Sequence, residues 1–175
     1  YFSNPDVFEM VTTNCLTGRA CYLTEKNNRQ RLLDVVKASS SLPYVSKIVN
    51  VDGLPMLDGG IVDSIPVMRA MEQGHHKNVV ILTRNYGYRT KERDRKIPHF
   101  IYKNYPRLRV CLSRRCYEYN KQLEMVEEME RSGQVVCIRP ERPLEVSRKE
   151  KDVEKLERLY EEGFYLGERF IKEYM

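Results

Sequence analysis

Hydrophobic residues recur along this chain with two spacings, which divide it into strands and helices. Alternating or continuous apolar runs predict strands at 7–13, 19–24, 47–51, 78–83 and 134–139, with a short one around 56–57. Apolar residues at helical spacing predict helices at 31–38, 67–72, 99–103, 113–131 and 149–174. Because strands and helices are interleaved along the chain, we predict one α/β layer structure.

Two segments carry more specific predictions about packing. The run 78–83 is continuously apolar and follows a helix, which predicts a central parallel strand covered on both faces. The order strand, helix, strand from Leu54 to Thr83 then predicts a βαβ crossover. In the last helix, one stripe is expected to face inward: Val153, Leu156, Tyr160, Phe164, Gly167 and Ile171.

The stretch 53–66 holds the strongest candidate for chemistry. Asp58 follows the short strand, and Gly59 and Gly60 come directly after it. Glycines without a Cβ allow a steep turn or a close approach, so the Asp58 carboxylate is presented at the end of the strand. An ordinary Asp-Gly turn explains the same residues. Asp63 could form a two-carboxylate site with Asp58, but a solvated or helix-capping role is the stronger interpretation.

Composition narrows the class of protein. The chain has 175 residues, of which 41% are hydrophobic, and no apolar run approaches the roughly 20 residues needed to cross a bilayer. The first residues show no signal peptide, and a start at Tyr1 without Met suggests a piece of a longer protein.

The five cysteines are dispersed without a CxxC pair, so we expect reduced core thiols, no metal site and a cytoplasmic setting.

The net charge of +5 is unevenly distributed. Residues 84–121 carry 12 Lys and Arg against 3 acids, together with 6 of the 12 Tyr. A solvated surface is the first interpretation of this segment, and a patch that lies on a membrane is the second. Nucleic-acid binding comes third, because no recognised nucleic-acid motif accompanies the charge.

Several segments, taken in order, resemble the C-terminal half of a patatin-like phospholipase of the bacterial branch. They are 11–14 with 17–18, 38–43, 57–60 with 65–67, 79–83 and 136–140. The resemblance implies a three-layer α/β/α, FabD/lysophospholipase-like architecture, here as a partial domain. It makes residues 1–175 the C-terminal part of one patatin-like domain, with a helical region at 94–131 and a closing helix at 149–174.

The same resemblance implies a lipid acyl hydrolase that cleaves carboxylic esters by a Ser–Asp dyad without a cofactor. Asp58 would be its catalytic aspartate, with Gly59 and Gly60 as the active-site loop. A carboxylate can accept the serine proton, so His75, His76 and His99 need no catalytic role. The Gly-x-Ser-x-Gly elbow is absent from the sequence, and the segment 39–41 is expected to be structural. We therefore expect no hydrolysis by this chain alone.

A lipid substrate favours docking at a membrane. Arg93, Arg95, Lys96 and Lys103 are the candidate docking residues, with the inner membrane face as a second location beside the cytoplasm. No nucleic-acid partner is expected. The alternative function is a non-catalytic module that binds lipid or a membrane surface, in which the Asp-Gly-Gly segment is only a turn.

Overall fold

A computed structural model describes residues 3–91, 97–147 and 150–174. The described part of the chain contains six strands and four α-helices, so the predicted α/β class is confirmed. It divides into two compact units, one of residues 1–66 and 90–122 and one of 67–89 and 123–175. No helix among the described residues is both long and apolar enough to cross a membrane.

The first unit is built on a four-stranded sheet in the order β2-β1-β4-β3, with every neighbouring pair antiparallel. Its strands are β1 (Met10–Asn14), β2 (Arg19–Leu23), β3 (Val49–Val51) and β4 (Leu54–Asp58). β1 and β2, which correspond to the strands predicted at 7–13 and 19–24, form an antiparallel hairpin. Asp52 and Gly53, both with positive φ, form the turn between β3 and β4.

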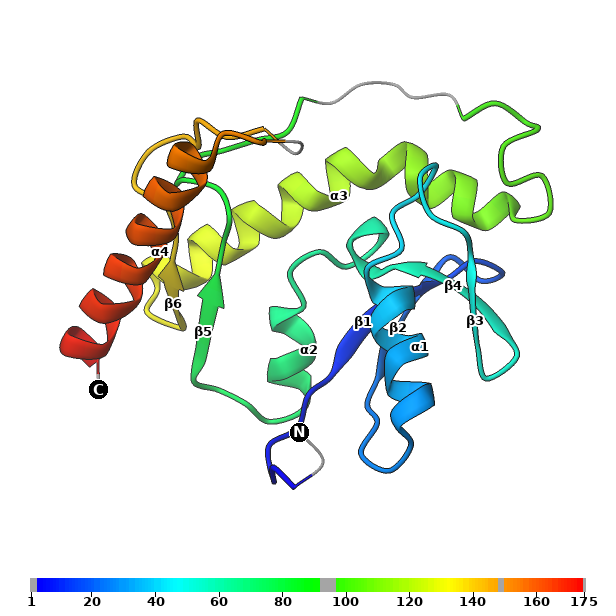
Figure 1. Cartoon of the computed structure of the whole chain (residues 1–175), viewed down its shortest axis with the longest axis horizontal. Coiled ribbons are helices and arrows are strands. Elements are labelled where there is room, and N and C mark those ends of the chain that lie inside the picture. Colours follow the sequence, from blue (N-terminus) through cyan, green and yellow to red (C-terminus); the bar gives the residue numbers. More distant parts are fainter. Residues whose placement is uncertain (1–2, 92–96, 148–149, 175) are drawn as a thin grey trace. The chain divides into compact units, whose positions relative to one another are not determined.

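Alternation along β4 places neighbouring residues on opposite faces of this sheet. Met56 packs with Val35 of helix α1 (Arg29–Ser39), while Leu57 packs with Leu108 at the start of helix α3 (Pro106–Arg131). Helix α1 contacts β1, β3 and β4 of this sheet (Figure 1). The strand predicted around 56–57 is thus confirmed as buried on both faces, and it ends at Asp58.

The second unit contains a two-stranded parallel sheet of β5 (Asn78–Ile81) and β6 (Val135–Ile138). The predicted parallel pairing of β5 is correct, but its central position is wrong, since Val79 and Ile81 are exposed and β6 is its one partner in the described residues. The predicted βαβ crossover is also wrong. β4 and β5, on either side of helix α2 (Val67–Glu72), belong to different sheets.

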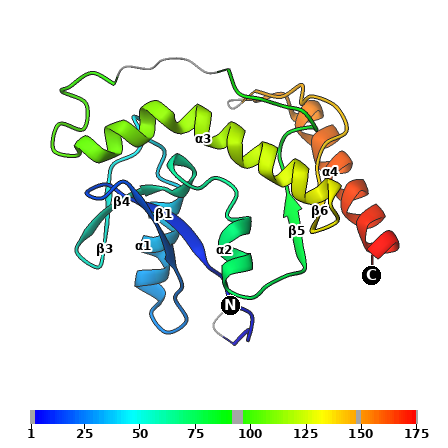
Figure 2. The same ribbon diagram turned by 180° about the vertical axis from the view of Figure 1, so that it is seen from behind.

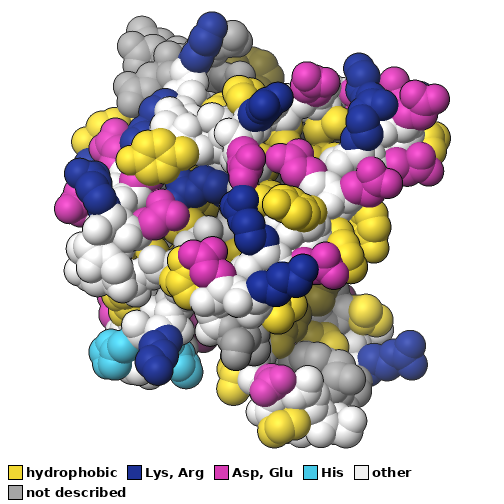
Figure 3. Space-filling view, turned by 90° about the vertical axis from the view of Figure 1, so that its left-hand side faces the viewer, with side chains coloured by type: hydrophobic (Ala, Val, Ile, Leu, Met, Phe, Trp, Pro, Cys, Tyr) yellow, Lys and Arg dark blue, Asp and Glu magenta, His cyan; other side chains and the backbone are white. Residues whose placement is uncertain are grey.

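Helix α4 (Val153–Tyr174) contacts β6 and packs with a side that the sequence did not predict (Figures 1 and 2). Leu166 is its buried residue, whereas five residues of the expected inward stripe are exposed: Val153, Leu156, Tyr160, Phe164 and Ile171. On the side of the molecule that carries α4, hydrophobic side chains lie at the surface among acidic and basic ones (Figure 3). Periodicity identifies residues that share a face, but not which face packs.

The basic segment before α3 and the start of α3 both differ from the prediction. Residues 99–104 form turns and not a helix, and α3 begins at Pro106, seven residues before the predicted start at 113. Proline suits the first turn of a helix because its missing N–H has no partner there. The three-layer architecture and the extent of a single patatin-like domain stay predictions.

Candidate active site

Asp58 is the last residue of β4 and caps the single 3₁₀ turn η1 (Gly59–Ile61) that follows. Its Oδ1 accepts a hydrogen bond of 2.7 Å from the Gly60 N–H. Its backbone is held on both sides, because its N–H donates to the Ser41 carbonyl and its carbonyl accepts from the Thr13 hydroxyl. The carboxylate is half-buried, and Oδ2 has no hydrogen-bond partner among the residues that the structure describes. Asp58 therefore presents one held oxygen and one open oxygen.

Glycine is required at positions 59 and 60 for different physical reasons. A Cβ on Gly59 would lie 2.4 Å from the carbonyl oxygen of Val11, a distance that no side chain tolerates, so the turn packs directly on β1. A Cβ on Gly60 would lie 3.0 Å from Asp58 Oδ1 and 3.5 Å from Ser64 Oγ. Gly60 therefore leaves room for the Asp58 carboxylate to fold back onto its N–H.

Two side chains of α3 hold the segment that follows Asp58. Arg115 Nε donates to the Gly60 carbonyl oxygen at 2.8 Å, and Ser64 Oγ donates to the same oxygen at 2.9 Å. Gln122 Oε1 accepts from the backbone N–H groups of Ser64 and Ile65 at 3.0 and 3.2 Å. Arg115 and Gln122 are seven residues apart, so they project from one face of the helix. Neither residue could be identified from the sequence, since nothing in their local pattern relates them to residue 60.

Asp63 helps to hold this segment and is not placed as a second catalytic carboxylate. Its Oδ2 accepts from the Tyr22 hydroxyl at 2.7 Å, and its Oδ1 accepts from Gln122 Nε2 at 2.8 Å. The predicted solvated or capping role is therefore wrong. With both oxygens engaged, Asp63 holds Gln122 in the orientation that binds the backbone at 64–65.

The serines near Asp58 are engaged with the backbone. Ser39 Oγ donates to the Val11 carbonyl, Ser41 Oγ to the Lys37 carbonyl and Ser64 Oγ to the Gly60 carbonyl. The structural role expected for 39–41 agrees with these contacts and with the bond from the Asp58 N–H to the Ser41 carbonyl. None of these three hydroxyls is placed as a nucleophile.

The other candidate residues are more dispersed. Lys103 is exposed, while Arg93, Arg95 and Lys96 lie outside the described residues. His75, His76 and His99 are all exposed. The five cysteines are free thiols, and burial raises the pKa of Cys15 and of Cys137 to about 11, so both thiols stay protonated near neutral pH.

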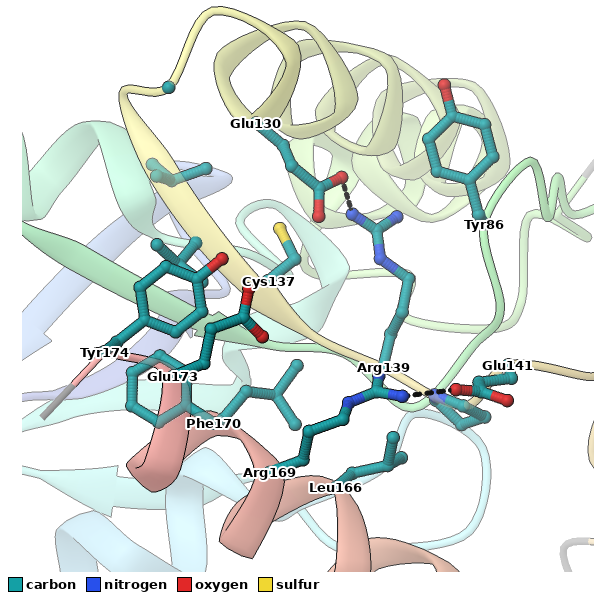
Figure 4. A pocket seen from close by; sticks show the side chains of 15 residues that line it. Tyr86, Glu130, Cys137, Arg139, Glu141, Leu166, Arg169, Phe170, Glu173 and Tyr174 are labelled. Atoms are coloured by element: carbon teal, nitrogen blue, oxygen red, sulfur yellow. Dashed lines mark hydrogen bonds and ion pairs between the residues drawn. The ribbon is translucent and has the colours of Figure 1, made fainter.

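A cavity of about 510 Å³ lies in the second unit, between β6 and α4 (Figure 4). Two guanidinium groups line it, but each is paired: Arg139 with Glu130, and Arg169 with Glu141 at 2.6 Å. Tyr86 also lines the cavity, and its ring lies 5.2 Å from the Arg139 guanidinium carbon. Both guanidinium groups are therefore neutralised inside the protein, and neither is left unpaired for a ligand anion.

Comparison with known proteins bears on the segment that contains Asp58. Residues 16–71 match the family model of patatin-like phospholipases. This segment is thus similar to patatin-like phospholipases. The resemblance read from the sequence is thus confirmed over the stretch that includes the Asp58 turn, the serines at 39–41 and Pro66.

A second family model and one relative also match parts of this chain. Residues 105–175 match a domain of unknown function, DUF6363, which includes Arg115 and Gln122. A stretch of 56 residues is 46% identical to the uncharacterized protein YjjU of Escherichia coli (strain K12). That stretch covers 31% of this chain and 16% of YjjU, so the chain matches only a small part of this relative.

Proposed function

We propose that Asp58 is the general base of a Ser–Asp dyad in a lipid acyl hydrolase. The family model that matches residues 16–71 is that of phospholipases, which suggests ester hydrolysis on lipids. In such a reaction the carboxylate accepts the proton of the serine hydroxyl as the oxygen attacks the ester carbonyl. The aspartate passes this proton to the alcohol as the ester C–O bond breaks, which leaves the acyl-enzyme. It then accepts a proton from the water that attacks the acyl-enzyme and gives that proton to the serine oxygen as the carboxylic acid is released.

The observation that carries this proposal is the state of the Asp58 carboxylate. Gly60 N–H binds Oδ1 and fixes the plane of the group, while Oδ2 is open to a partner that the described residues do not supply. An aspartate that served only to form the turn would need only the hydrogen bond from the Gly60 N–H to Oδ1. A serine hydroxyl at hydrogen-bond distance from Oδ2 would complete the dyad.

The architecture of the first unit is compatible with the proposal. Separate hydrophobic clusters cover the two faces of the sheet, one with Val35 of α1 and one with Leu108 of α3. This arrangement supports the proposed three-layer fold around Asp58. The chain itself contains no Gly-x-Ser-x-Gly, so we propose that its 175 residues do not hydrolyse esters alone.

The test compares two proteins in hydrolysis of para-nitrophenyl esters and phospholipids. The 175-residue chain is expected to give no turnover, and the protein encoded by the complete gene is expected to be active. In the complete protein, Asp58→Asn should lower kcat by about 10²–10⁴-fold, the usual contribution of a positioned general base. If the 175-residue chain hydrolyses esters and loses this activity on Asp58→Ala, the proposal that these residues do not hydrolyse esters alone is refuted.

Asp63→Asn is the matched control, because both Asp63 oxygens already bind protein groups. Its kcat should fall less than tenfold, and an equal loss in the two variants would show that Asp58 acts through structure. If the complete protein binds lipid but cleaves no ester, the alternative of a non-catalytic lipid-binding module is favoured.

A further inference from the structure

Two loops of the first unit meet at a pair of tyrosines. One loop, residues 40–48, connects α1 to β3, and the other, residues 97–105, precedes α3 (Figure 1). The Tyr44 N–H donates to the Tyr102 hydroxyl at 2.8 Å, and the ring centroids are 5.8 Å apart. Both residues have positive φ, 70° for Tyr44 and 53° for Tyr102, a conformation that aromatic residues rarely adopt. The contact between the loops is therefore held at the expense of local backbone strain.

The inner sides of the two loops are anchored next to Asp58. Ile48, Ile97 and Tyr102 pack against the hydrophobic cluster that contains Leu57 and Ile61, the residues on either side of the Asp58 turn. The Ser41 carbonyl, at the start of the 40–48 loop, accepts the Asp58 N–H. A surface formed by these loops is thus attached to the candidate active site.

The outer sides of the loops expose large apolar side chains. Val45 is 82% exposed and Phe100 is 78% exposed, with Leu42 and Tyr44 partly exposed beside Val45. Exposure of this kind at the ends of two contacting loops leaves apolar surface in water for no evident gain in folding.

The charged residues close to these apolar side chains in the sequence have one sign. Residues 35–51 and 97–117 contain no Asp or Glu, whereas Lys37, Lys47, Lys103 and Arg107 are exposed. The acids that border the two stretches include Asp52 and Glu118, which are paired with Arg31 and Arg114. Apolar tips on stretches that carry cations and no acids are complementary to an anionic membrane, whose headgroups attract Lys and whose interior accepts apolar side chains.

We propose that the 40–48 and 97–105 loops form a docking surface for anionic lipid bilayers. An acidic protein or a nucleic acid would be attracted by the lysines but would leave Val45 and Phe100 without a role. The surface retains Lys103 from the residues expected by sequence, and adds apolar residues that charge patterning could not identify. It deepens the proposed function by placing the membrane beside Asp58, but the binding itself needs no ester turnover.

The sequence contains no tryptophan, so one substitution supplies a specific fluorescent reporter. Val45→Trp in the 175-residue chain is titrated with vesicles of phosphatidylcholine containing about a third phosphatidylserine. We expect a blue shift of the emission and quenching by brominated lipid, both lost in vesicles of phosphatidylcholine alone. Val7→Trp is the matched control: Val7 is 75% exposed but has Asp6 and Glu9 nearby in sequence, and its emission should not shift.

Sedimentation with the same vesicles tests the two contributions separately. Val45→Asp combined with Phe100→Asp should reduce the bound fraction more than tenfold, and Lys47→Ala or Lys103→Ala should each reduce binding roughly fivefold. Unchanged sedimentation of the aspartate variant, or equal emission shifts at positions 45 and 7, would overturn the proposal. A shift with heparin but not with vesicles would overturn it in favour of an acidic polymer.

These outcomes are independent of the proposed catalysis. Docking by the chain with no ester cleavage in the complete protein would refute the dyad alone. Ester cleavage in the complete protein, with no vesicle binding by the chain, would refute the docking surface alone.

Discussion

Arg115 of α3 donates a hydrogen bond from Nε to the carbonyl oxygen of Gly60, across 2.8 Å and 55 residues of sequence. The peptide that it holds directly follows the Gly60 N–H that binds Asp58 Oδ1. The orientation of the candidate catalytic carboxylate therefore depends on a side chain from the region that matches DUF6363. Patatin-like and DUF6363-like segments of this chain meet in one hydrogen-bonded turn.

Removal of the Arg115 side chain should destabilise the first unit. Arg115→Ala leaves the Gly60 carbonyl with Ser64 as its remaining side-chain donor, and the free energy of unfolding should fall by about 1–2 kcal/mol. Urea denaturation measures the loss. Arg114→Ala is the control, because Arg114 forms an exposed pair with Glu118 and its removal should change stability by less than about 0.5 kcal/mol. Equal losses at 114 and 115 would contradict a specific role for the Gly60 contact.

Substitution of the two types of glycine should have opposite effects. Gly59→Ala places a Cβ 2.4 Å from the Val11 carbonyl oxygen, which is backbone and cannot move aside, so we expect a loss of about 3 kcal/mol or more. Gly163→Ala adds a methyl group to an exposed position of α4 with no atom within 4 Å, and should stabilise by about 1 kcal/mol. Chemical denaturation followed by circular dichroism separates the two results. A neutral effect of Gly59→Ala would show that the turn does not pack on β1.

The buried Glu127 should make the second unit sensitive to acid. Hydrogen bonds from Arg89, at 2.7 and 3.0 Å, are the main cause that lowers the pKa of Glu127, against the opposing effect of burial. Because the folded-state pKa is below the ordinary value, this pair contributes stability above about pH 4.5, and the contribution is lost as the pH falls through the lowered pKa. Glu127→Gln should therefore reduce stability at pH 7 and flatten its decrease between pH 5 and pH 3.

The Glu127 measurement has an exposed neighbour as its control. Glu128 pairs with Arg131 at the surface, and both side chains are about two-thirds exposed. Glu128→Gln should leave the pH profile of unfolding unchanged. If both glutamine variants give the same profile as the unmodified chain, the ion pair of Arg89 and Glu127 contributes nothing to acid sensitivity.

Asn28 should stabilise α1 as its cap. Its Oδ1 accepts the Arg31 N–H at 3.0 Å, so Asn28→Ala is expected to cost about 1 kcal/mol in thermal or urea unfolding. Asn27→Ala tests the adjacent residue, whose backbone N–H rather than its side chain makes the contact to Glu25. A larger loss at position 27 than at position 28 would place the start of the helix differently.

Local signals in the sequence were sufficient for most element types. The N-cap at Asn28, the turn at 52–53 and the end of β4 at Asp58 follow from residue chemistry within a few positions, and the structure has all three. The helix expected at 99–103 failed for a tertiary reason. Tyr102 there adopts a left-handed conformation, in which its hydroxyl accepts the Tyr44 N–H.

Long-range pairing could not be predicted in the same way. Whether the strand before α2 and the strand after it share a sheet depends on which partners bind their edges, and β4 pairs with β1 and β3 instead. The apolar stripe of α4 was correctly recognised as a stripe, but Leu166 on another side is the buried residue. Periodicity contains no information on which neighbour a face will meet.

The sequence by itself determined the residue types and the turn at the candidate site: a carboxylate at the end of a strand, followed by two glycines that permit a tight fold. Only the tertiary structure decided how that carboxylate is held. Three hydrogen bonds hold this segment across 41 to 59 residues of sequence: Arg115 to the Gly60 carbonyl, and Gln122 and Tyr22 to the Asp63 carboxylate. Hydrogen bonds over such separations exist only once the chain has packed. The same packing distinguishes Asp58, with an open oxygen, from Asp63, with none.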